Sequence, residues 1–271
     1  MQMLCRLLTF SYMIGFFIKK AFFDGWDNLI GMVLFNIGYM FLAFVSIYII
    51  MAALSMHLMI GFVVLAVVLL LFSIIAGGTA EVVHNYSDYK HDAWSAFKSG
   101  LKRNIRHSLL LFAVVLFFVI TLYPVIPFWF SQIGGIAGSI AGIVLVWIDV
   151  AIVLALPYYF PLMNLLPADR PLKTLKKCLI VLADNMAFSL FFLLYSVICI
   201  AITVFTLGLI PGVVGLQLAG QDAMKLRMFK YDYLETENTD RKHIPWEDLL
   251  YDEREKVGPR SLKSMIFPWK Y

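Results

Sequence analysis

Acidic and histidine side chains recur three residues apart just after a glycine pair in the first third of the chain. Glu81 and His84 have this spacing, and Asp88 and His91 repeat it. On a helix, an acid and a histidine at this spacing share one face, as they do in di-iron helix bundles. A metal site needs further ligands that converge from other helices, and the sequence indicates no such set. We therefore predict no metal and no cofactor, and keep Glu81 and His84 as a candidate polar site.

A third candidate, Asp149, is the one acid in the middle of a long apolar stretch, between Ile148 and Val150. An ionisable group deep in a membrane is costly and is a candidate functional group by default. Two interpretations stay open: a structural aspartate that is protonated or hydrogen-bonded, or a group that moves protons or substrate. Polar residues that could partner it from other helices are Asn36, Thr121 and Ser196.

The sequence lacks the motifs of common catalytic sites. It contains no GxSxG, Walker loop, HExxH or Rossmann fingerprint, and no paired catalytic carboxylates. Cys5, Cys178 and Cys199 are too dispersed for a disulfide framework or a zinc site. The acids and bases near the C-terminus alternate, which is typical of a solvated face and not of a nucleic-acid patch. We predict neither an enzyme nor a nucleic-acid partner.

The composition places these residues in a membrane protein. The 271 residues are 61% hydrophobic and 15% charged, against about 25% charged in an average soluble domain. Half of the charged residues fall in positions 222–271, with ten of each sign. A bilayer can cover the apolar surface of the remainder, whereas a soluble core cannot. The chain is therefore expected to be a polytopic membrane protein with a short polar tail.

The pattern of apolar segments predicts an all-α fold, a membrane helix bundle with about six transmembrane helices. Residues 1–28 are predicted to form an interfacial helix, with a tilted span as the alternative. Residues 29–230 form the transmembrane domain, and residues 231–271 form a tail that docks back on the bundle. The predicted spans are 29–54, 58–76, 108–130, 136–156, 187–209 and a short sixth at 210–223.

Loop charge predicts the orientation of these spans. The connections at 85–107 and 166–186 carry the basic residues, whereas those at 52–57 and 131–136 carry no charge. Because positive loops stay in the cytoplasm, both basic connections and the N-terminus are expected there. Lys225 and the basic residues that follow it belong on the same side, which requires the sixth segment to cross. The C-terminus is then cytoplasmic as well.

The first basic connection has amphipathic helical spacing over residues 89–108. Its aromatic and aliphatic residues recur every three or four positions, and its cations occupy the positions between them. This pattern is typical of a helix on the anionic inner leaflet, and it also fits a docking helix for a protein partner. The candidate lipid or partner contacts in the two basic connections are Trp94, Phe97, Lys98, Leu101, Lys102, Arg103, Arg106, Lys173, Lys176 and Lys177.

Two stretches, IIAGGTAEVVHNYSDYKHDAWSAFKSGLKRNIRHSLL and YYFPLMNLLPADRPLKTLKKCLIVLADNMAFSL, resemble the YesL-like family of bacterial integral membrane proteins, whose function is unknown. The first leads from the small-residue end of a span into an aromatic, basic connection. In the second stretch, a Tyr/Phe-Pro-Leu run is followed by a Leu/Lys-rich helix. The resemblance covers roughly residues 10–230. It implies a bacterial inner-membrane location, about six spans and an association with carbohydrate ABC-transport systems, and it implies no catalytic residues.

These observations lead to two functional hypotheses. The first is an accessory or scaffold component of a transport system, which contacts a membrane or cytoplasmic protein partner through its cytoplasmic helices. The second is a small-molecule transporter or channel that uses Asp149 within the membrane.

Overall fold

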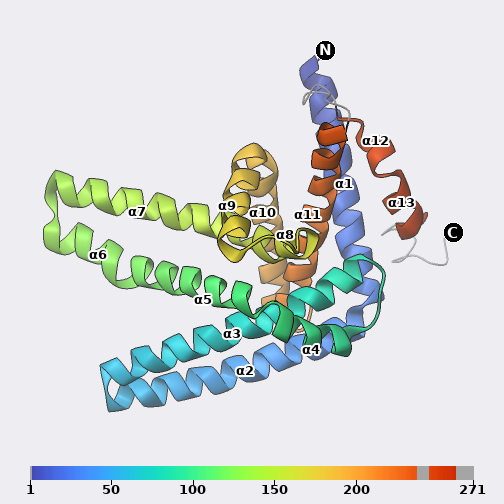
Figure 1. The fold of residues 1–271 in the computed structure, drawn as a ribbon. Helices are drawn as coiled ribbons and strands as arrows, with labels where there is room; N and C mark the ends of the chain where they lie inside the picture. Colours follow the sequence, from blue (N-terminus) through green and yellow to red (C-terminus); the bar gives the residue numbers. More distant parts are fainter. Residues whose placement is uncertain (1, 237–243, 261–271) are drawn as a thin grey trace.

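The computed structural model describes residues 2–236 and 244–260. Within these residues the chain forms helices joined by short turns, with no β-strand (Figure 1). Five of these helical segments are long and apolar enough to cross a membrane. They are Leu29–Met56, Leu58–Ser87, Ile105–Ile133, Gly135–Leu165 and Met186–Phe205. The predicted all-α membrane bundle is thereby confirmed.

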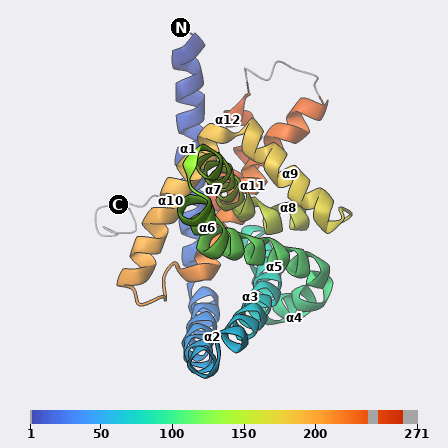
Figure 2. The same ribbon diagram turned by 90° about the vertical axis from the view of Figure 1, so that its left-hand side faces the viewer.

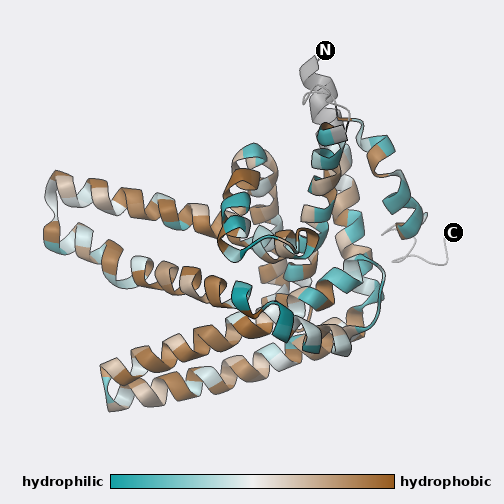
Figure 3. Ribbon diagram, in the orientation of Figure 1, coloured by the Kyte–Doolittle hydropathy of each residue, from teal (hydrophilic) through white to brown (hydrophobic). Residues whose placement is uncertain are grey.

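Two apolar hairpins project from the rest of the molecule (Figure 1). The first consists of α2 (Leu29–Met56) and α3 (Leu58–Ser87). The second runs through α5 (Ile105–Ile120) and α6 (Ile126–Phe128) to α7 (Gly135–Ala155). Their outer surfaces are apolar (Figure 3) and exposed, as Phe41 at 71% and Trp147 at 68% illustrate. Side chains of this kind are stable in contact with lipid tails and not with water.

The remaining helices gather at the other end of the molecule, which we call the polar end because most hydrophilic residues lie there (Figure 3). Figure 2 shows the same helices with the hairpins pointing toward the viewer. The fifth apolar span, α10 (Met186–Phe205), lies beside these helices. The others are α1 (Gln2–Asp27), α4 (Ala93–Arg103), α8 (Tyr159–Leu165), α9 (Pro171–Asp184), α11 (Gly212–Thr236), α12 (Trp246–Leu249) and α13 (Tyr251–Val257).

The described part of the tail docks back on the bundle, as predicted. Trp246, Leu250 and Val257 are buried in one apolar cluster with Phe17 and other residues of α1. The predicted apolar end at 265–269 lies outside the described residues. The α1 helix and the described part of the tail are therefore packed against each other through large buried side chains.

Five helical segments among the described residues are long and apolar enough to cross a membrane, where about six spans were predicted. The predicted sixth segment, 210–223, is the first part of α11, which continues as one helix to Thr236. Polar and charged residues from Gln217 onward make α11 too hydrophilic to count as a span. It nevertheless returns the chain to the polar end, because Lys225 contacts Asp88 just after α3.

A buried asparagine fixes the turn between α10 and α11. The side-chain amide of Asn36 donates to the carbonyl oxygens of Leu209 and Pro211, both at 2.8 Å, and its oxygen accepts from the backbone N–H of Val214 at 3.0 Å. Gly212 has a positive φ of 64°, and a Cβ there would lie 2.2 Å from the Asn36 amide nitrogen. Only glycine fits this close approach. Asn36 therefore holds a turn and does not partner Asp149.

Candidate functional site

The basic amphipathic segment forms a shorter helix than predicted. It begins at Ala93 and ends at Arg103, where Asn104 bends the chain into α5. Asn104 donates its side-chain N–H to the carbonyl oxygen of Gly77 at 2.9 Å, which holds the bend against α3. The segment 89–108 is thus two helices because a buried hydrogen bond fixes the junction between them.

Small residues let α4 approach α3 closely. A Cβ on Gly100 would lie 2.9 Å from the carbonyl oxygen of Gly78, and one on Gly78 would lie 2.7 Å from the ring of Phe97. Phe97 and Leu101 both pack over Gly78. Two of the candidate contact residues, Phe97 and Leu101, therefore anchor α4 to α3.

The outward face of α4 carries one aromatic and several cations. Trp94 is 62% exposed, and the ammonium of Lys98 lies 5.1 Å from the centroid of its ring. Lys102 and Arg106 are also exposed. Arg103 instead bridges to Glu81 on α3, so its charge is partly neutralised within the protein. The exposed surface thus consists of Trp94, Lys98 and Lys102 on α4 and of Arg106 at the start of α5. We call this surface the α4 face.

The second basic connection is less free than its composition indicates. On α9, Lys173 forms an ion pair with Asp169 at 2.6 Å, and Lys177 pairs with the other oxygen of the same carboxylate. Lys176 remains exposed. Of the three lysines predicted to contact lipid or a partner here, Lys176 has the most accessible charge.

Asp149 lies where the sequence predicted a buried acid, and one of its three predicted partners contacts it. Thr121 donates its hydroxyl to the Asp149 carboxylate at 2.7 Å, across the second hairpin. Both residues are buried, and Asp149 Oδ2 has no hydrogen-bond partner among the described residues. Ser196 donates to the carbonyl oxygen of Phe192 instead. Thr121 begins a π-helical turn, and such turns often occur at functional positions.

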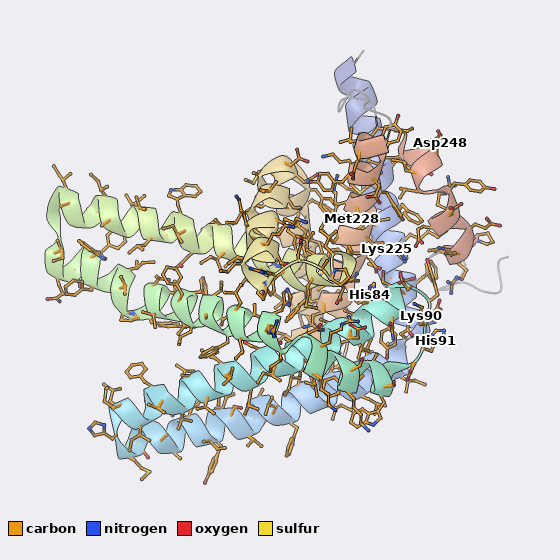
Figure 4. All side chains as sticks on the ribbon, viewed as in Figure 1. His84, Lys90, His91, Lys225, Met228 and Asp248 are labelled. Atoms are coloured by element: carbon orange, nitrogen blue, oxygen red, sulfur yellow. The ribbon has the colours of Figure 1, made fainter. Side chains whose placement is uncertain are left out.

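The two acid–histidine pairs separate in the structure. Glu81 pairs with Arg103, while His84 Nδ1 lies 3.2 Å from the side-chain amide of Gln221 on α11. Asp88 pairs with Lys225, and His91 lies 2.9 Å from the Asn28 side chain. Figure 4 shows His84, Lys90 and Lys225 at the polar end. In the part of the chain that the structure describes, no group of three metal-binding side chains converges. The partners Arg103, Gln221, Lys225 and Asn28 all lie outside α3, so the spacing of residues along that helix did not indicate them.

The most buried polar feature is a group of charges that sequence analysis missed. Lys20 is fully buried on α1, and its ammonium lies 2.6 Å from Asp24, 3.2 Å from Glu253 and 3.7 Å from Asp222. These acids lie on α1, α13 and α11 respectively. We call this group the charged junction; its members are Lys20, Asp24, Ser87, Asp88, Tyr89, Asp222, Lys225, Glu253 and Lys256.

Lysine and carboxylate stabilise each other's charge in this junction. Burial opposes the charge of Lys20, but Asp222 and Asp24 outweigh that effect and raise its pKa. Burial likewise opposes the charge of Glu253, yet Lys20 and Lys225 hold its pKa near 2. One signal was available in the sequence, because Lys20 and Asp24 are four residues apart, the spacing of a helical ion pair. The contributions from α11 and α13 could not be inferred without the fold.

A separate cavity of about 500 Å³ lies within the membrane domain. Residues of α3, α5, α7, α8, α10 and α11 line it, and nearly all of them are apolar. The exceptions include Gln217 and Gln221 on α11. Gln217 accepts a hydrogen bond from Thr79 at 2.6 Å. The volume is within the usual range for small-molecule sites.

The arrangement as a whole comprises an anchored basic helix, a buried charged junction, a buried acid in the middle of a span and an apolar cavity. The likeness to the YesL-like family stays a prediction from the sequence. Comparison of the chain with protein-family models, with curated proteins and with solved structures found no match.

Proposed function

We propose that this chain is a non-enzymatic protein of a bacterial inner membrane, and that it serves as an accessory or scaffold component of a carbohydrate transport system. In this proposal the polar end and both termini are cytoplasmic. The basic connections support that orientation, because α4 and α9 both lie at the polar end and positive segments stay in the cytoplasm.

The observation that carries the proposal is the anchored α4 face. Its helix is held by glycine-to-backbone contacts, so Trp94 and the neighbouring lysines are presented on a fixed scaffold. Exposed tryptophan and cations on a rigid element are typical of the residues that dominate binding energy in protein interfaces. A rigid surface also loses little conformational entropy when a partner binds. The partner expected is an acidic surface on a transport-system subunit.

Charge reversal on α4 tests this proposal. We expect Lys98→Glu with Lys102→Glu to reduce the amount of transport-system subunit that co-purifies from native membranes at least roughly tenfold, because two favourable charge contacts become repulsive. A photo-crosslinking residue in place of Trp94 should capture the same subunit, identified by mass spectrometry. Arg103 is left intact because it pairs with Glu81 inside the protein.

The matched control is Lys176→Glu on α9, another exposed lysine at the polar end. General attraction to anionic lipid would make this change as harmful as those on α4. Equal loss of the subunit in both variants, or no loss in the α4 variant, would contradict a specific α4 contact.

A second function, small-molecule transport, is favoured by Asp149 and the apolar cavity. Val153 lines the cavity and lies one helical turn beyond Asp149. We expect Asp149→Asn to abolish uptake by reconstituted vesicles if the protein is itself a transporter, because the amide cannot exchange a proton. Subunit co-purification should be unchanged in this variant. This role for Asp149 would be excluded if the Asp149→Asn variant lost the co-purifying subunit and wild-type vesicles showed no uptake.

A further inference from the structure

Two carboxyl groups in the charged junction each have one oxygen that no donor satisfies. Asp24 and Asp222 are 1% and 0% exposed. One oxygen of Asp24 accepts from Lys20 at 2.6 Å, and one oxygen of Asp222 accepts from the Ser87 hydroxyl at 2.7 Å. Asp24 Oδ1 and Asp222 Oδ2 have no partner in the part of the chain that the structure describes. A buried acceptor left unpaired is costly.

Both side chains lie against the same ammonium group, because Lys20 Nζ is 2.6 Å from Asp24 and 3.7 Å from Asp222. Two ionised carboxylates around one cation repel strongly in a buried site, and proteins relieve that repulsion by keeping one proton between them. A neutral Asp24 carboxyl group can donate its O–H to the Asp222 carboxylate. One proton then satisfies an oxygen on each side chain.

The charges around Asp24 and Asp222 also indicate that the pair binds one proton. The ionic members of the junction are the carboxylates of Asp24, Asp88, Asp222 and Glu253 and the ammonium groups of Lys20, Lys225 and Lys256. Four negative charges thus face three positive ones within the junction, so one bound proton balances these seven groups. The other titratable groups that act on them are His84 and Lys90 beside Asp88, Tyr89, Tyr195 on α10, and Arg260, which pairs with Asp27.

We propose that Asp24 and Asp222 form a proton-binding pair that holds α1 to α11, and that loss of this proton loosens α1 and α13 from the polar end. The two acids lie on different helices, and Lys20 links the same pair to Glu253 on α13. Repulsion between the ionised carboxylates therefore acts directly on the contacts that join the termini. This proton site is independent of which partner or substrate the protein serves.

The direction in which pH changes the stability follows from how tightly the folded protein binds protons. Burial and the neighbouring Asp222 raise the pKa of Asp24 to about 8, and burial raises the pKa of Asp222. From about pH 4 to about pH 8 the folded protein therefore holds a proton that the unfolded chain has lost, so stability falls as pH rises. The pKa values of Glu253 and Asp88 are lowered, so their stabilisation is lost only in acid. Lys20 stays charged throughout because its pKa is raised.

Infrared difference spectroscopy on the full-length protein in detergent tests for the proton directly. We expect a protonated carboxyl C=O band at about pH 6 that disappears by about pH 9. Asp24→Asn and Asp222→Asn should each remove this pH-dependent band. The control Asp248→Asn changes an exposed acid on α12 and should retain it. No band in the wild type, or a band that survives both junction variants, would overturn the proposal.

Thermal unfolding across the same pH range gives a second measurement. One proton bound only by the folded state lowers the ratio of folded to unfolded protein roughly tenfold for each pH unit of increase below the folded-state pKa. The wild type and Asp248→Asn should both show this contribution to the slope, and Asp222→Asn should lack it. A wild-type stability that falls no more steeply with pH than that of Asp222→Asn is incompatible with the proton pair.

Discussion

Lys20→Met is expected to destabilise the protein by about 3–5 kcal/mol, the usual cost of removing one partner from a buried ion pair. The methionine fills a similar volume, so the loss is mainly electrostatic. Asp24, Asp222 and Glu253 would keep their charge or take up protons without the ammonium group that lies between them. The measurement is the unfolding midpoint of the purified protein in detergent.

Two comparisons separate this electrostatic cost from a general effect of losing a lysine. Lys102→Met removes an exposed charge from α4 and should change stability by less than about 0.5 kcal/mol. The double variant Lys20→Met with Asp24→Asn should be more stable than Lys20→Met alone, because it also removes a carboxylate that has lost its cation. A Lys20→Met variant as stable as Lys102→Met would show that the junction contributes little to folding.

The sequence predicted the parts of the fold that depend on local composition. Apolar stretches long enough to cross a bilayer indicate spans whatever their neighbours are, and all five observed spans were predicted in this way. The predicted sixth segment, 210–223, is not among these five helices, because it is the apolar start of a helix whose later residues are polar. In the structure, α11 is one helix from Gly212 to Thr236, so its apolar start cannot be assessed separately.

Side-chain partners were harder to predict, because they depend on how distant elements meet. Thr121 was named as a partner of Asp149 because both lie within apolar spans, where polar side chains usually hydrogen-bond to one another. Asn36 met the same criterion, yet it caps the α10–α11 turn. The charged junction combines residues more than 200 positions apart, such as Lys20 and Glu253. No spacing rule connects them.

The predicted contacts on α4 lie on two sides of the helix. Helical periodicity correctly grouped Phe97 and Leu101 on one apolar side. We assigned that side to lipid or a partner, and in the structure both residues pack on Gly78 of α3. The glycines at 77, 78 and 100 were the available signal, because small residues allow two helices in a membrane protein to approach closely.

That close approach leads to the second large effect, which is expected for Gly100→Leu. A Cβ at this position would lie 2.8 Å from the Cβ of Glu81 and 2.9 Å from the carbonyl oxygen of Gly78. The obstacle includes backbone, which cannot rotate away, so α4 must shift from α3. We expect a loss of about 3 kcal/mol, the upper part of the range for overpacked interiors. The unfolding midpoint in detergent measures this loss.

A cysteine placed on α4 distinguishes displacement of the helix from unfolding of the whole protein. Ala96 is 5% exposed, so Ala96→Cys should react slowly with a water-soluble maleimide in the wild-type background and rapidly together with Gly100→Leu. Gly38→Leu is the control, because nothing lies within 4 Å of a Cβ at that glycine on α2. It should leave both stability and labelling close to the wild type, since leucine also favours a helix more than glycine does. Slow labelling of Ala96→Cys in the Gly100→Leu protein would mean that α4 does not depend on the glycine contact. The α4 face would then lack the rigid support on which its proposed role in partner binding rests.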